Sequence, residues 1–164
     1  MAFADGRFEG GGCFFRCALG KGGVKPAADK REGDGASPAG AWPVRRIYFR
    51  PDKGPPPVTG LPLISLQPED GWSDDPAETR YNQLVALPCP GSHERLWRED
   101  GLYDLIVELG YNDDPVVAGK GSAIFLHIAR PGYLPTEGCV ALAEADLREV
   151  LRALDGRSVI EIRS

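Results

Sequence analysis

The chain has 164 residues, of which 42% are hydrophobic and 26% charged, with a formal net charge of −5 and a pI near 5.1. This composition predicts a folded chain rather than a disordered one, and its length suits one domain, expected to span residues 1–164. The negative charge argues against general binding to nucleic acid, because the phosphates would be repelled. No apolar run approaches the roughly 20 residues that cross a membrane.

Short apolar or β-branched runs bounded by glycine or proline predict strands. They fall at residues 14–19, 44–50, 61–66, 84–87, 102–109, 121–128 and 158–162. Residues 30–43, rich in glycine and alanine, and the acidic residues 67–77 are expected to be loops. Leucines and a valine at helical spacing predict one amphipathic helix over residues 144–154. The expected fold is therefore mainly β with one helix, an α+β arrangement of mixed or antiparallel sheets with the helix packed near the C-terminus.

The N-terminal residues do not have the pattern of a secretion signal. Asp5, Arg7 and Glu9 stand where such a signal needs an apolar segment, so no signal peptide is expected in this chain.

The cysteines and histidines do not have zinc-site spacing, so no metal is expected. The chain has four cysteines, Cys13, Cys17, Cys89 and Cys139, which allow two disulfides in three pairings. The first three are expected to be structural thiols or disulfide partners, because none stands in a Gly/His context. His93 is expected to be a solvated loop residue.

The densest chemical signal is the segment from His127 to Leu142, HIARPGYLPTEGCVAL. A histidine at the end of an apolar strand is followed, eleven residues later, by Gly138-Cys139. A histidine beside a cysteine forms a thiolate–imidazolium pair in which the thiolate is the nucleophile. Backbone amides at Gly138 and Cys139 would hold the oxyanion of a tetrahedral intermediate. The pattern predicts acyl transfer or amide hydrolysis.

The same segment resembles the catalytic motif of the L,D-transpeptidase (YkuD-type) family, in which a histidine precedes a Ser/Thr-x-Gly-Cys element. Thr136-Glu137-Gly138-Cys139-Val140 stands in that place. An upstream G-x-TP-x-G-x-aromatic segment of the family is matched by the run from Gly33 to Val44, GDGASPAGAWPV. Two elements in the right order make the resemblance specific, and it covers the chain from about Phe8 to Ile162.

The resemblance implies a β-sandwich-like fold and a peptidoglycan-crosslinking enzyme that needs no cofactor. Cys139 would attack a donor stem peptide, forming a thioester that passes to the amine of an acceptor stem, with His127 as the base. The links would be 3→3, or 1→3 in a divergent branch. Carbapenem-type β-lactams would acylate the same thiol, and the periplasm or cell envelope would be the location.

Several positions depart from the family pattern. Ile128 replaces a glycine after the histidine, Glu137 stands before Gly138, and Ala141 replaces an arginine expected soon after the cysteine. A clamp for the substrate carboxylate is therefore expected elsewhere, at Arg130 or, second, at Arg80. Further residues expected to bind the substrate are Thr136, Glu137, Tyr81, Asn82 and Tyr103.

Three alternatives follow from the same residues. A hydrolase, an L,D-carboxypeptidase or endopeptidase, would use the same thioester with water as the acceptor. A wall-peptide binding module with a decayed site is suggested by the departures at Ile128 and Ala141. A redox protein using Cys13 and Cys17 has the least support, because their spacing is not that of a redox pair.

Overall fold

The computed structural model describes residues 1–164 and contains thirteen strands, one α-helix and one short 3-10 turn. The elements in chain order are β1 Ala2–Phe3, β2 Arg7–Gly10, β3 Cys13–Ala18, β4 Val24–Pro26, β5 Ser37–Phe49, β6 Leu63–Ser65, β7 Asp70–Ser73, β8 Leu84–Ala86, β9 His93–Arg95, β10 Leu105–Leu109, β11 Phe125–Ile128, the 3-10 turn Pro131–Tyr133, β12 Val140–Leu142, α1 Glu144–Ala153 and β13 Val159–Arg163.

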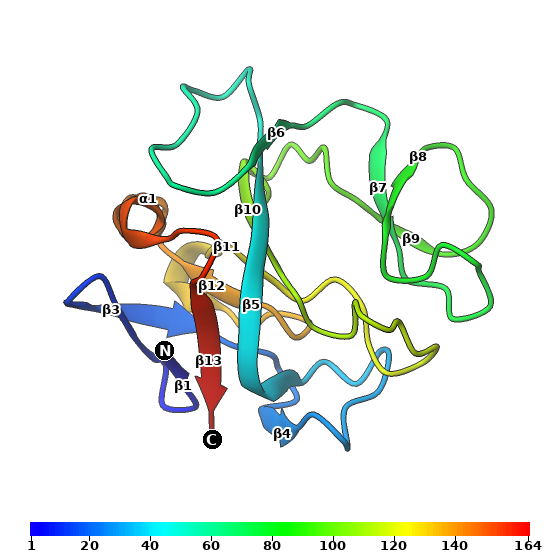
Figure 1. The fold of residues 1–164 in the computed structure, drawn as a ribbon, viewed down its shortest axis with the longest axis horizontal. Helices are drawn as coiled ribbons and strands as arrows, with labels where there is room; N and C mark the ends of the chain where they lie inside the picture. The colour runs from blue at the N-terminus through cyan, green and yellow to red at the C-terminus, as the bar shows by residue number, and fades with distance from the viewer.

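The long strand β5 organises the fold (Figure 1). Its first half pairs antiparallel with β13, and its second half pairs antiparallel with β10. The remaining strands connect these two neighbours in the order β10-β11-β12-β3-β2-β1-β13. Because β5 pairs with β13 at one end and with β10 at the other, this strand path closes on itself around a common interior.

The main core of 21 buried residues fills this interior. Strand β10 shows the alternation that builds it: Leu105 and Val107 belong to this core, whereas Ile106 faces a second cluster. Helix α1 adds Leu147, Val150 and Leu151, which lie at the predicted helical spacing and are buried. The predicted helix therefore forms, ending at Ala153 rather than at residue 154.

A second, three-stranded sheet in the order β8-β7-β9 lies on the other side of β5 from α1 (Figure 1). It packs through a cluster of nine buried residues, in which Trp72 of β7 meets Tyr48 of β5 and Phe125 of β11 edge to face. Aromatic pairs in this arrangement add to the burial of apolar area. Cys139 belongs to the same cluster, so this sheet forms one wall of the region around the thiol.

The structure confirms the α+β class, with mixed sheets: β11–β12, β1–β13, β4–β5 and β5–β6 are parallel pairs. Two loop predictions are wrong in part. Residues 37–43 form the first half of β5, where pairing with β4 and β13 overrides the weak strand propensity of its proline, alanines and glycine. Asp70–Ser73 within the acidic segment is β7, and its Trp72 is buried.

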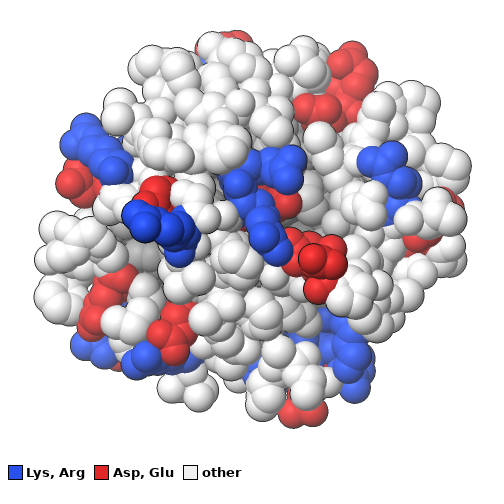
Figure 2. Space-filling view, viewed as in Figure 1, with Lys and Arg blue, Asp and Glu red and all other residues white.

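Two strands begin later in the sequence than predicted. Strand β10 begins at Leu105 and β11 at Phe125, and residues just before each strand border the pocket described below. No helix of the structure is long and apolar enough to span a bilayer. On the face shown in Figure 2, basic side chains lie beside acidic ones, with no continuous basic area.

Candidate active site

His127 and Cys139 come from two adjacent strands and line the same pocket. His127 lies on β11, which pairs in parallel with β12, and its partner in the register is Ala141. Cys139 directly precedes β12, two positions before Ala141 and therefore on the same side of the chain. Both residues are buried, at 5% and 6% exposure, yet both border a pocket of about 430 Å³.

The Cys139 thiol is held between two backbone groups. Its S–H donates to the Ala123 carbonyl, with Sγ 3.1 Å from the oxygen, and Sγ accepts the Phe125 N–H at 3.4 Å. Burial raises the pKa of the thiol to about 12, and the nearby Glu94 carboxylate acts in the same direction. The resting sulfur is therefore a thiol.

The His127 imidazole is neutral and has a defined tautomer. Its Nδ1 lies 2.8 Å from the Ile128 carbonyl oxygen, which can only accept, so Nδ1 bears the proton and Nε2 a free lone pair. Burial lowers the pKa of His127 to about 4. This differs from the expected thiolate–imidazolium pair, because desolvation favours the uncharged form of both groups.

The turn before Cys139 is closed by Thr136. Its hydroxyl donates to the Cys139 carbonyl at 2.7 Å and accepts the Gly138 N–H at 3.1 Å. The Gly138 amide is therefore engaged, contrary to its expected role in holding an oxyanion. The Cys139 N–H donates to no other group of the chain and remains available for that role.

The two sequence elements that carried the resemblance meet in space. A Cβ added at Gly138, whose φ is +137°, would lie 2.9 Å from the Ala36 carbonyl oxygen, so only glycine lets the two backbones approach this closely. Ser37 beside it accepts the Gly20 N–H at 2.9 Å. The upstream segment thus supports the turn that presents the thiol.

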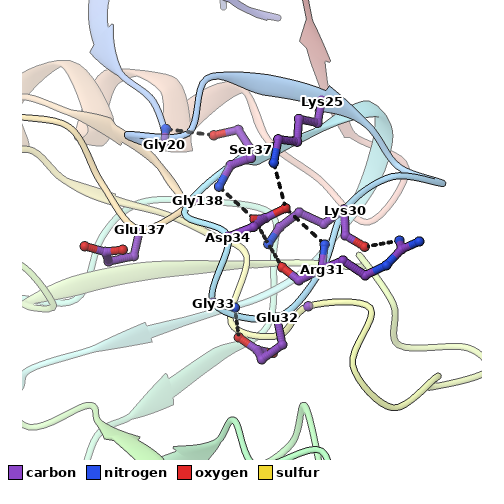
Figure 3. Close-up of polar contacts among 12 residues, drawn as sticks. Gly20, Lys25, Lys30, Arg31, Glu32, Gly33, Asp34, Ser37, Glu137 and Gly138 are labelled. Carbon is purple, nitrogen blue, oxygen red and sulfur yellow. Dashed lines mark hydrogen bonds and ion pairs between the residues drawn. The ribbon is translucent and has the colours of Figure 1, made fainter.

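Asp34 fixes the conformation of this upstream segment (Figure 3). Its carboxylate accepts from the Lys30 ammonium at 2.7 Å and from the backbone N–H groups of Arg31 and Ala36 at 3.0 and 2.9 Å. The Lys30 side chain is 3% exposed, so this ion pair is shielded from water. These contacts hold the pKa of Asp34 well below its usual range against the opposing effect of burial.

Four further predicted residues border the pocket: Arg130, Tyr103, Thr136 and Glu137. Tyr103 packs its ring edge-on against the His127 imidazole and donates its hydroxyl to Glu94 at 2.7 Å. Glu137 is exposed and forms an ion pair with Lys21. Arg130 forms no ion pair, so its guanidinium has no partner within the chain.

Three predicted residues do not border the pocket. Tyr81 is buried and donates its hydroxyl to Glu32. Arg80 is engaged with Gln83 and the Leu84 carbonyl. Asn82 is buried among backbone groups and the Trp72 indole. None of the three therefore borders this pocket, and Tyr81 and Asn82 instead connect loops through their hydrogen bonds.

Strand β9 supplies pocket residues that the sequence did not single out. His93, Glu94 and Arg95, with Arg98 just after the strand, all border the pocket. Arg98 is paired with Asp100 and Glu94, whereas Arg95 forms no ion pair. His93 is thus a wall residue rather than a loop residue. The polar and apolar residues of the run HERLWR alternate, which is typical of a strand. The run gives no indication that its side chains border the same pocket as Cys139.

The remaining cysteines lie outside the pocket, and all four are free thiols. Cys13 is exposed and Cys17 is buried on the same strand, β3, where burial raises the pKa of Cys17 to about 11. No disulfide forms in the structure, and Cys139 is the only cysteine that borders the pocket.

Comparison with known proteins gives one match. A family model described as the L,D-transpeptidase catalytic domain, YkuD, matches residues 7–162. No curated protein and no solved structure matches the chain. The matched span includes both sequence elements, β5 and the pocket.

Proposed function

Because the chain belongs to the L,D-transpeptidase catalytic domain family, we propose that it crosslinks peptidoglycan stem peptides, with Cys139 as nucleophile and His127 as base. The family acts on peptidoglycan peptides and is associated with the cell envelope, where we place this protein. The observation that supports the assignment is that a buried thiol and a neutral imidazole with a free Nε2 border one pocket.

The first half-reaction forms a thioester. His127 Nε2 accepts the thiol proton as Cys139 Sγ bonds to the donor carbonyl carbon, because a neutral thiol is a weak nucleophile until its proton is taken. The Cys139 N–H donates to the oxyanion. Collapse of this intermediate breaks the peptide bond, and the His127 imidazolium returns the proton to the leaving amine.

The second half-reaction transfers the acyl group. The acceptor amine attacks the thioester carbonyl while His127 takes a proton from it, and collapse expels the Cys139 thiolate, which regains that proton. Cys139 is then again a neutral thiol and His127 a neutral imidazole. The proposed product is a 3→3 link, with 1→3 as the alternative. No metal or organic cofactor has a role in this scheme.

Arg130 is the proposed clamp for a substrate carboxylate. It borders the same pocket as His127 and forms no ion pair. A guanidinium binds a carboxylate through two parallel hydrogen bonds, which fixes both position and orientation. Arg130 would then replace the arginine absent at Ala141.

The test is incubation of the purified chain with disaccharide-tetrapeptide, with products identified by mass spectrometry. Wild type is expected to form crosslinked dimers, and Cys139→Ala none. Cys13→Ala is the matched control, because this thiol is exposed and outside the pocket, and it should retain full activity. A trimmed monomer without dimer would instead indicate the hydrolase. Bound but unchanged substrate would indicate the binding module, and dimers from Cys139→Ala would refute the assigned nucleophile.

A further inference from the structure

Asn82 is a buried residue with an unusual backbone conformation. Its φ is +56°, and its side-chain amide is fully used. Oδ1 accepts the Trp72 indole N–H at 3.0 Å, and Nδ2 donates to the Tyr111 and Asn112 carbonyls at 3.1 and 2.8 Å. An amide with all these bonds has one fixed orientation. The Oδ1 atom is therefore a rigid acceptor contributed by the chain between β7 and β8.

Asn82 Oδ1 also accepts the Ala123 N–H at 3.0 Å. Ala123 has a φ of +52°, a region that residues other than glycine enter only when their surroundings hold them there. The carbonyl of the same residue accepts the Cys139 S–H. One peptide segment thus connects the Asn82 amide to the sulfur through two consecutive hydrogen bonds.

We propose that Asn82 is a positioning residue for Cys139, because it holds Ala123 in the conformation that directs its carbonyl at the thiol. This inference depends on the proposed function in one respect, which is that Cys139 is the nucleophile. It assigns to the Asn82 amide a task distinct from substrate contact.

The Ala123 carbonyl and the Phe125 N–H act on the thiol in opposite directions. A carbonyl accepting the S–H stabilises the neutral thiol, whereas an N–H donating to sulfur stabilises the thiolate. Removing the Asn82 amide frees Ala123 to leave its left-handed conformation, and the carbonyl contact is lost while the Phe125 contact remains. The fraction of Cys139 present as thiolate must then rise at a given pH.

The test compares Asn82→Gly with Asn112→Gly. Glycine accepts the positive φ at both positions, so each variant deletes the amide without straining the backbone. Asn112 is a matched control because its amide makes three hydrogen bonds within residues 112–121 and none to Ala123. The readout is the ultraviolet absorbance of the thiolate at about pH 10, after subtraction of the same variant carrying Cys139→Ala.

The Cys139 thiolate signal should rise about threefold or more in Asn82→Gly, which corresponds to a fall of about half a unit in the pKa of the thiol. It should stay at the wild-type level in Asn112→Gly. Equal signals in wild type and Asn82→Gly would overturn the proposal, as would an equal rise in both glycine variants.

A second variant covers the case in which Asn82→Gly does not fold. Asn82→Asp keeps an acceptor for Trp72 and Ala123 but loses the two donors, and any charge it adds opposes thiolate formation. Its thiolate signal should be at or below the wild-type level, and a signal above that level would contradict the proposal. The readout needs no crosslinking, so a chain that makes no dimers but shows the shift would refute only the proposed function.

Discussion

The Tyr103 ring lies edge-on against the His127 imidazole, with ring centroids 5.2 Å apart and an interplanar angle of 81°. The contact confines one side of the imidazole, while the Tyr103 hydroxyl is anchored on Glu94. A base that must reach the thiol proton gains from such confinement, since a displacement of about 1 Å costs about a hundredfold in rate.

Tyr103→Phe should keep this confinement and lose only the hydroxyl bond. We expect crosslinking activity within about threefold of wild type and a loss of about 1 kcal/mol in the free energy of unfolding, because the half-buried Glu94 carboxylate loses one of its donors and keeps Arg98. Tyr103→Ala should lower activity more than tenfold. Tyr48→Phe is the control, since it deletes a similar 2.7 Å bond to Glu108 away from the pocket. Equal activities of the Phe and Ala variants would show that the ring has no such role.

The pH dependence of kcat/KM should have its acidic limb near pH 4. Burial lowers the pKa of His127 to about 4, so the imidazole stays neutral, and able to accept a proton, as the pH falls below the ordinary value of 6.5. Rates measured from pH 3.5 to 8 test this. An acidic limb near pH 6.5 would show that the imidazole is solvated or paired with a thiolate before substrate binds.

The sequence predicts two residues that the structure places at the pocket better than it predicts the remaining wall. His127 and Cys139 stand out because they belong to the His and Gly-Cys elements of one short segment, and parallel pairing of β11 with β12 then brings both to the same pocket. Arg95 and Glu94 could not be placed in the same way, since a three-residue strand has too short a pattern to reveal what it faces. Asn82 and Tyr81 have polar and aromatic types suited to a groove, yet long-range hydrogen bonds bury them elsewhere.

The same reasoning applies to the fold. Apolar runs predicted the central strands and α1, because their side chains form the core. Residues 37–43 have weak strand propensity, and only their neighbours β4 and β13 make them extended. Strand pairing between distant segments is not visible in local composition.

Arg130→Ala should raise KM about tenfold with little change in kcat, because a clamp on the substrate carboxylate binds ground state and transition state alike. Steady-state kinetics on a tetrapeptide donor measure this. Arg80→Ala is the matched control, since that guanidinium is engaged with Gln83 and Leu84 outside the pocket. If the two variants had the same KM as wild type, Arg130 would not be the clamp.

A carbapenem should form a covalent adduct on one cysteine. The strained carbonyl is an acyl donor for the same attack as the peptide, so the intact mass should rise by one inhibitor molecule, located on Cys139 after digestion. Cys13 serves as the internal control because it is exposed and lies outside the pocket. Equal labelling of both cysteines would mean that the pocket confers no reactivity.

Asp34→Asn should destabilise the chain by about 3 kcal/mol or more, because it leaves the buried Lys30 ammonium without its counter-charge. Lys30→Met should cost less, since it removes the buried charge itself. Urea unfolding measures both. The pKa of Asp34 is depressed in the folded state, so the stabilisation is present above the ordinary carboxyl pKa and is lost as the pH falls through the folded value. Equal losses in the two variants would contradict the buried-charge argument.

Part of the pocket wall comes from β9, which belongs to the small sheet inserted between β6 and β10, whereas His127 lies on β11 and Cys139 lies just before β12. Under the proposed function, substitutions in this insert would change substrate recognition more than the chemistry at the thiol. Asn82 lies in this insert and accepts the Ala123 N–H, so under our proposal a replaced insert would leave Cys139 correctly placed only if it supplied an equivalent acceptor.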